Sequence, residues 1–125
     1  MDEHREVTIS PDRYTTYRYA GASGDFNPIH LDEEFARSVG LPGRILHGLW
    51  TMAQVARAQT DAVGDPVALK SLSVQFRGLG QIEHEITVVS DLKSQSDGEA
   101  EFAVEAIQDG NKLVRRGRAV LKTAS

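Results

Sequence analysis

The sequence predicts an α+β fold, in which helices pack on one face of an antiparallel sheet. Helix signals fill the first half of the chain, whereas the sequence after Pro66 consists of alternating or β-branched runs. A nearly continuous apolar segment, residues 45–64, separates the two halves. Because 125 residues are typical of one domain, we expect residues 1–125 to form a single domain.

The N-terminal elements are expected to be a short strand and a helix. Residues 5–9, REVTI, alternate polar and apolar side chains, which predicts a strand. A helix is expected over residues 11–20, with Ser10 as its N-cap and Pro11 at its first position. Gly21 is expected near the end of this helix.

Two further helices are expected before the strands. A short one lies between the N-cap Asp32 and the helix-stopping Gly40. The apolar segment 45–64 predicts a long helix that ends at Gly64. Few side chains in the first half of this helix are polar. Because a helix that is apolar on most of its sides is usually buried, we expect this helix to be buried.

The rest of the chain predicts four strands, 67–76, 81–92, 99–108 and 112–122, separated by Gly, Asn and Asp turns. An antiparallel sheet wrapped around a long buried central helix is the hot-dog arrangement, here as a single α+β domain. Such a sheet leaves an edge strand unpaired. We therefore expect pairing with a second copy as a homodimer, or with a related hot-dog subunit as a heterodimer.

Composition excludes several classes of partner. The formal net charge is −4 and the pI is about 5.5, so we expect neither nucleic acid nor a membrane surface as a partner. The chain has no cysteine, which removes thiol nucleophiles and thiolate metal sites. Its first ten residues are charged and lack the apolar core of a signal peptide. These features predict a cytoplasmic protein.

The segment GASGDFNPIH, residues 21–30, concentrates polar side chains between two expected helices. Gly, Asp, Asn and Pro are common turn formers, so one interpretation is a structural turn with an exposed histidine. The other is a proton-transfer pair, since Asp25 and His30 can share a water molecule. Pro28 fixes its own φ and restricts Asn27, so the loop is expected to be rigid and Asn27 to support it.

A second feature stands at the start of the long helix. Gly48, in RILHGLW, is expected in its first turn, where unpaired N–H groups and the helix dipole favour a developing negative charge. Glycine also lets a ligand carbonyl approach the backbone closely. An ordinary helix start is the alternative interpretation.

Residues 19–58 closely resemble the MaoC-like family of (R)-specific enoyl-CoA hydratases and 3-hydroxyacyl-thioester dehydratases. The pattern G-D-x-N-P-[IL]-H-x-D is present as GDFNPIHLD, and H-G-[ML] follows as HGL. The resemblance implies that Asp25 and His30 activate water for addition to a trans-2-enoyl thioester, or remove it in reverse. It also implies that the Gly48 N–H polarises the thioester carbonyl. The acyl carrier would be coenzyme A or an acyl carrier protein, and no cofactor is expected.

Other polar residues receive simpler interpretations. A metal site built from Asp25, His30, Asp32 and His47 is conceivable but not expected, and His47 is interpreted as a capping or packing residue. Leu49, Trp50 and Met52 are expected in the core or lining an acyl tunnel. Four arginines could meet the phosphates of an acyl carrier, although a solvated strand face explains most of them; they are Arg77, Arg115, Arg116 and Arg118.

Two alternative functions remain open. A hot-dog acyl-thioesterase would place an acid on the long helix, but that helix carries Gln54 and no acid before Asp61. The chain could also be one subunit of a heteromeric dehydratase that is inactive alone. Such a subunit has no evident need for both Asp25 and His30.

Overall fold

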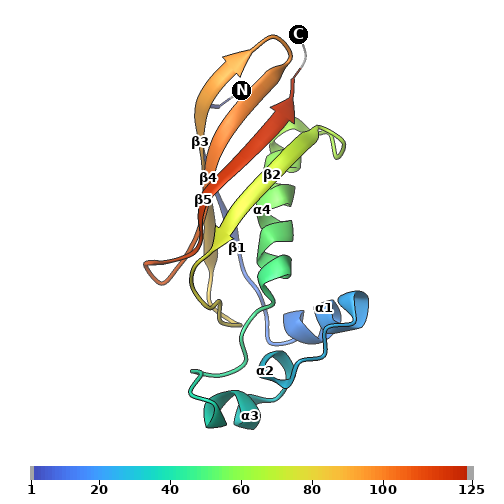
Figure 1. Ribbon diagram of the computed structural model, residues 1–125, viewed down its shortest axis with the longest axis vertical. Helices are drawn as coiled ribbons and strands as arrows, with labels where there is room; N and C mark the ends of the chain where they lie inside the picture. The colour runs from blue at the N-terminus through green and yellow to red at the C-terminus, as the bar shows by residue number, and fades with distance from the viewer. Residues whose placement is uncertain (1, 124–125) are drawn as a thin grey trace.

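The computed structural model describes residues 2–123 and shows one antiparallel sheet with a long helix lying against it (Figure 1). The strands are β1 (His4–Ile9), β2 (Leu69–Phe76), β3 (Ile86–Ser96), β4 (Glu99–Gln108) and β5 (Asn111–Lys122). Their order in the sheet is β1-β3-β4-β5-β2, so β1 and β2 form the two edges. The predicted α+β class and hot-dog arrangement are confirmed.

Four helices precede β2 in the chain: α1 (Thr15–Ser23), α2 (Pro28–Leu31), α3 (Glu33–Ser38) and α4 (Gly48–Val63). Figure 1 shows α4 running along the sheet, with the three short helices grouped beyond the end of the sheet, near the start of α4. The α2 turn lies inside the segment that the sequence predicted as a loop. The loop is therefore more regular than expected.

The core lies between α4 and the inner face of the sheet. Residues of β4 alternate strictly, and every second one, including Phe102 and Val104, is buried. The side chains of α4 that are buried come from one side of the helix: Thr51, Val55, Ala58 and Gln59. Leu49, on another side, is 62% exposed. Within one chain the sheet therefore encloses one face of the helix, and the remaining faces are partly open.

The predicted start of the first helix was wrong. The α1 helix begins at Thr15, and Ser10 and Pro11 lie outside it. Asp12 organises this start, because its Oδ1 accepts a hydrogen bond of 2.8 Å from the N–H of Tyr14. The end was also misplaced, since α1 continues to Ser23 and its C-cap is Gly24, whose φ of +79° suits glycine.

The long helix begins three residues later than predicted. Residues 45–47 are not helical, because the N–H of Ile45 donates to the Ile29 carbonyl at 3.1 Å and that of Leu46 to Gly80 at 2.8 Å. These bonds join the segment before α4 to α2 on one side and to the loop after β2 on the other. The predicted end at Gly64 is confirmed.

The strand predicted over 81–92 begins only at Ile86. It also continues four residues beyond the predicted end, to Ser96. The buried side chain of Gln108 accounts for the later start: it accepts from the N–H of Gln81 and donates to the carbonyls of Gln81 and His84. Its amide thus takes the place of a neighbouring strand. The strands predicted over 67–76, 99–108 and 112–122 match β2, β4 and β5 to within two residues.

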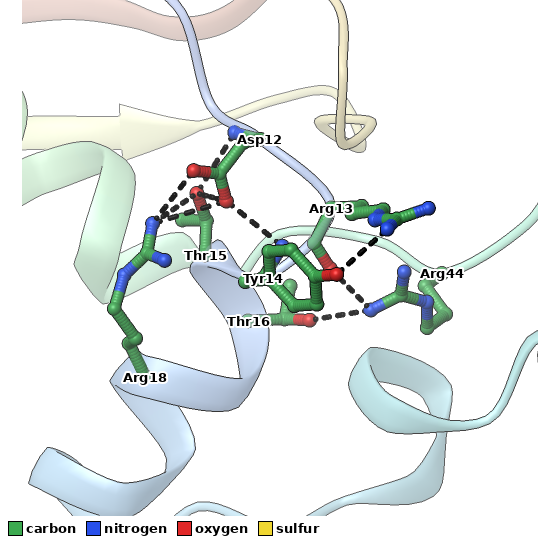
Figure 2. A network of polar contacts seen from close by, with 7 residues as sticks. All are labelled: Asp12, Arg13, Tyr14, Thr15, Thr16, Arg18 and Arg44. Carbon is green, nitrogen blue, oxygen red and sulfur yellow. Dashed lines mark hydrogen bonds and ion pairs between the residues drawn. The ribbon is translucent and has the colours of Figure 1, made fainter.

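A buried arginine ties the short helices to the segment before α4. The guanidinium of Arg44 donates to the Arg13 carbonyl at 2.9 Å and to the Thr16 hydroxyl at 3.2 Å (Figure 2). It also pairs with Glu33 at 3.4 Å and lies 4.5 Å from the centre of the Tyr17 ring. Only 8% of Arg44 is exposed. A buried cation with this many partners fixes the relative positions of α1, α3 and residue 44.

We predict that Arg44→Met lowers the free energy of unfolding by about 2 kcal/mol, because it leaves the Arg13 carbonyl and the buried Thr16 hydroxyl without their donor and removes the ion pair with Glu33. The matched control is Arg57→Met, since Arg57 pairs with Asp61 at the same 3.4 Å but is exposed. That variant is expected to change stability by about 0.5 kcal/mol or less. Urea denaturation measures both, and equal effects would contradict the structural role of Arg44.

Candidate active site

The loop that carries Asp25 is held by its own short-range hydrogen bonds. The Asp25 carboxylate Oδ1 accepts from the N–H of Asn27 at 3.2 Å. The Asn27 side chain in turn accepts from the N–H of Ile29 at 3.2 Å and caps α2, with Pro28 as the first helical residue. Asn27 and Pro28 therefore support the loop locally, Asn27 as the N-cap of α2 and Pro28 as its first residue with a fixed φ.

His30 is buried in the α2 turn and points its ring toward the chain before α4. Its Nδ1 lies 2.8 Å from the carbonyl oxygen of Ile45. Because a carbonyl only accepts hydrogen bonds, Nδ1 carries the hydrogen, and in the neutral ring Nε2 holds the lone pair. This Nε2 faces the Asp25 Oδ2 at 3.9 Å, which is too long for a direct hydrogen bond. The predicted pair is thus brought together with a gap between its polar atoms.

His47 contacts both members of this pair. Its Nε2 donates to the backbone carbonyl of Asp25 at 3.0 Å. Its ring stacks on that of His30, with centres 3.8 Å apart and planes 20° from parallel, and Tyr19 packs on it at 4.8 Å. Sequence reasoning interpreted His47 as a capping or packing residue: it occupies the N-cap position of α4 without a side-chain cap hydrogen bond, and its ring packs on those of His30 and Tyr19. No pattern in the sequence indicates the hydrogen bond from His47 to the Asp25 carbonyl.

Burial lowers the pKa of His47, and the positive charge of a protonated His30 would lower it further. The hydrogen bond to the Asp25 carbonyl and the Asp25 charge raise the pKa and oppose these effects without cancelling them. His47 Nδ1 is buried and has no hydrogen-bond partner among residues 2–123. A neutral His47 therefore suits this position, because a second proton would be buried without an acceptor.

Gly48 is the first residue of α4 and so lies in its first turn, as predicted, although the helix itself starts later than expected. The N–H groups of Trp50 and Thr51 donate to the His47 carbonyl, which leaves those of Gly48 and Leu49 as the first donors without an intrahelical acceptor. A Cβ at Gly48 would lie 3.3 Å from the ring of Phe76, so a larger side chain would crowd that ring. The exposed, positive end of a 16-residue helix thus begins one residue after His47.

The three apolar residues expected near the site lie in different environments. Leu49 is exposed, whereas Trp50 and Met52 are half-buried, and Trp50 packs against the core. A hollow of about 340 Å³ lies between Trp50 and α1, and Tyr19 is part of its wall. Because Tyr19 also packs on His47, this hollow adjoins the stacked rings of His30 and His47. We call these two rings, with Tyr19 and Asp25 beside them, the histidine cluster.

The side chains of Asp25, His30 and His47 offer three potential metal ligands within 4.8 Å of one another. Imidazole lone pairs lie in the ring plane, and in two stacked rings they run nearly parallel and do not converge on one ion. Asp32 is engaged elsewhere, because its carboxylate caps α3 by accepting from the N–H of Phe35. The geometry thus favours proton transfer over metal binding.

Comparison with solved structures places the sheet and helix in the class of hot-dog domains. An (R)-hydratase from A. caviae involved in PHA biosynthesis matches 97% of this chain and 94% of its own, with a TM-score of 0.87 and 20% sequence identity. A structure described as a MaoC-like dehydratase matches 99% of this chain and 41% of its own, with a TM-score of 0.89 and 27% identity.

The chain belongs to the MaoC-like domain family, whose model matches residues 1–111. The peroxisomal enoyl-CoA hydratase 2 of Arabidopsis thaliana is 42% identical over 73 residues, which are 57% of this chain and 23% of the plant enzyme. The fatty acid synthase subunit beta of Aspergillus oryzae is 35% identical over 105 residues, 81% of this chain and 5% of that subunit. The chain thus spans about a quarter or less of the length of these relatives.

Within residues 2–123, the helices are too short or too polar to cross a membrane.

We predict that His47 and His4 titrate at different pH values in an NMR pH titration. The His47 ring should titrate below its ordinary pKa of 6.5 because of burial, and the His4 ring above it because of its hydrogen bond to Asp91. His47→Gln and His4→Gln identify the two signals. A His47 midpoint at or above 6.5 would contradict the buried, neutral ring.

The same shift predicts the pH dependence of stability. An unfolded chain protonates His47 near pH 6.5, whereas the folded chain keeps it neutral to lower pH. The unfolded state therefore binds more protons in this window, and the contribution of His47 to the free energy of unfolding falls as pH decreases below 6.5.

Proposed function

We propose that this chain catalyses the reversible hydration of trans-2-enoyl thioesters to (R)-3-hydroxyacyl thioesters. The main observation behind this proposal is the distance of 3.9 Å between the Asp25 carboxylate and His30 Nε2, beside the N-terminus of α4. A water molecule in this gap would contact an acceptor on each side. The names of the relatives, an enoyl-CoA hydratase and an (R)-hydratase, support both the reaction and its stereochemistry.

In the proposed reaction, Asp25 and His30 orient one water molecule, and its oxygen forms a bond to C3 of the enoyl thioester. The Asp25–His30 pair takes the proton that the water loses, the double-bond electrons move toward the thioester carbonyl to give an enolate, and the pair then returns a proton to C2. The net change is addition of one water across C2 and C3. Because the two side chains form a coupled pair, the acid and base roles are assigned to the pair and not to either residue.

The N-terminus of α4 supplies the electrostatic part of the reaction. The Gly48 N–H, free of an intrahelical acceptor, donates to the carbonyl oxygen on which negative charge develops. The 16-residue helix dipole acts in the same direction. The hollow between Trp50 and α1 offers a place for the acyl chain next to this point. The thioester is carried by coenzyme A or an acyl carrier protein, and the mechanism needs no cofactor.

We further propose that two copies of the chain pair through the edge of the sheet and the open side of α4. Among residues 2–123 no strand pairs with the outer edge of β2, and Leu49 in α4 and Phe76 at the end of β2 are 62% and 52% exposed. A related complex, ChsH1–ChsH2 from Mycobacterium tuberculosis, shares the fold with a TM-score of 0.85. It supports the alternative of a heterodimer with a second hot-dog subunit.

Light scattering of the purified full chain is expected to give twice its 13.7 kDa mass. Pairing would bury apolar side chains that a single chain exposes, which stabilises the dimer. A monomer at micromolar concentration would contradict the homodimer and favour the heterodimer.

We predict that Asp25→Asn and His30→Ala each lower the rate of hydration of trans-2-enoyl-CoA by about 100-fold or more, since each removes one side of the water site. Loss of the enoyl-thioester absorbance measures the rate, and chiral chromatography measures the product. The matched controls are Asp61→Asn and His84→Ala, which change the same side chains at exposed positions.

Retention of full rate by either folded site variant would contradict the proposed pair. Release of free coenzyme A without formation of the 3-hydroxyacyl product would support the thioesterase alternative instead. A folded wild-type chain that is inactive at every chain length, but active after a second hot-dog subunit is added, would support the heteromeric enzyme.

A further inference from the structure

His47 contacts both members of the proposed proton-transfer pair and directly precedes Gly48 in the chain. Only 3% of the residue is exposed. Its Nε2 donates to the Asp25 backbone carbonyl at 3.0 Å, and its ring stacks on that of His30 with centres 3.8 Å apart. The proposed reaction gives His47 no step of its own, so these contacts need a separate explanation.

The Asp25 side of the water site lies in an exposed loop between α1 and α2. Two hydrogen bonds hold Asp25 locally: its N–H donates to the Ser23 hydroxyl at 3.1 Å, and its carboxylate accepts from the N–H of Asn27 at 3.2 Å. Both partners are two residues away, so these bonds shape the loop without fixing its place in the fold. The hydrogen bond from His47 spans 22 residues and ties the loop to the segment before α4.

The His30 side is held at one corner of its ring, where Nδ1 donates to the Ile45 carbonyl at 2.8 Å. A ring held by one hydrogen bond can still turn about the line of that bond. Stacking on His47, with planes 20° from parallel, restricts this turn and keeps Nε2 directed at Asp25. The His47 ring is held in turn by Tyr19, whose ring centre lies 4.8 Å away.

The backbone of His47 connects the pair to the start of α4. Its carbonyl accepts from the N–H groups of Trp50 at 3.1 Å and Thr51 at 3.3 Å, and the next N–H in the chain belongs to Gly48. His47 therefore contacts the proton-transfer pair with its ring and fixes the first turn of α4 with its carbonyl.

The proposed substrate requires such a connection. In a trans-2-enoyl thioester the double bond is conjugated with the carbonyl, so the distance between C3 and the carbonyl oxygen is nearly constant. The water site must therefore stand at a fixed place relative to the Gly48 N–H. A displacement of about 1 Å between reacting groups can lower a rate about 100-fold.

The second ring nitrogen of His47 argues against a role in packing alone. Its Nδ1 is buried and has no hydrogen-bond partner among residues 2–123. A buried polar atom without a partner destabilises a fold. A phenylalanine side chain would stack on His30 without this unpaired nitrogen, but it could not donate to Asp25. The hydrogen bond to Asp25 thus accounts for a histidine at this position.

We propose that His47 is a positioning residue, which holds the Asp25–His30 water site at a fixed place relative to the Gly48 N–H. The inference rests on the proposed function, because it concerns the rate of that reaction. His47 acts through Asp25 and His30 and does not touch the thioester. Its replacement should therefore lower kcat and kcat/KM together and leave KM nearly unchanged.

The test compares His47→Gln with His47→Met in the hydration of crotonyl-CoA and longer trans-2-enoyl-CoAs by the full chain. The two new side chains have nearly the same length, but only glutamine can donate a hydrogen bond to the Asp25 carbonyl. The Met variant should lose about 100-fold in kcat, with KM within about twofold of wild type. The Gln variant should keep at least about a tenth of the wild-type kcat, because the donor is restored. His47→Phe keeps a ring against His30 but has no donor, and should lose rate like the Met variant.

His4→Met is the matched control, since it makes the same replacement at an exposed position in β1, and it should keep the full rate. Urea denaturation separates positioning from folding. The Phe variant should unfold at no lower urea concentration than wild type, because it removes the unpaired Nδ1.

Four results would overturn the positioning role while the proposed function stands. They are equal rates in the Gln and Met variants, a full rate in the Phe variant, a rise in KM in place of the fall in kcat, and losses of rate that follow losses of stability. A folded wild-type chain that hydrates none of these thioesters would instead overturn the proposed function, and this inference with it.

Discussion

The hydrogen bond from His30 Nδ1 to the Ile45 carbonyl connects the two parts of the chain on which the site depends. It determines which ring nitrogen holds the lone pair, and it aims that nitrogen at Asp25. It also joins α2 to the segment that leads into α4. The backbone hydrogen bond from the Ile45 N–H to the Ile29 carbonyl makes the same connection a second time. One short extended segment thus sets both the tautomer of the neutral His30 ring and the position of the helix N-terminus.

The far half of α4 is fixed to the sheet by a different kind of contact. Gln59 is fully buried, donates to the Ser90 hydroxyl at 2.8 Å and accepts from Arg5 at 3.0 Å. Arg5 also lies over the Phe102 ring, 4.6 Å from its centre, so a cation from β1 closes this contact. Buried polar groups of this kind allow few alternative arrangements, because each would lose its partner. The start of α4 can therefore remain exposed to a substrate while the rest of the helix stays anchored.

The sequence was most informative where local chemistry decides the structure. The alternation in β4 and the helix stop at Gly64 follow from periodicity and backbone preference, and both are confirmed. The residues of the GDFNPIH segment do meet, because Asp25 and Asn27 make hydrogen bonds within four residues of themselves. The proposed catalytic roles of these residues remain predictions.

The parts that the sequence did not reveal depend on contacts between distant segments. The start of α4 at Gly48, three residues later than periodicity suggests, depends on bonds from Ile45 and Leu46 to Ile29 and Gly80. Likewise, nothing in the local sequence indicates that Gln108 would replace a strand partner or that Arg44 would be buried. Such contacts are set by the whole fold, and a pattern of neighbouring residues carries no record of them.

The residues that form the histidine cluster lie close together along the chain, from Tyr19 to Gly48, and the sheet contributes little to them directly. The bond to Ile45, the stacking on His47 and the caps of α2 and α3 are all internal to this stretch. These contacts therefore lie within one contiguous piece of the chain. A chimaera that moves this piece onto another hot-dog sheet would need to carry over the Phe76 ring that packs on Gly48, the Gly80 carbonyl that accepts from Leu46, and the partners of Arg44 at residues 13 and 16.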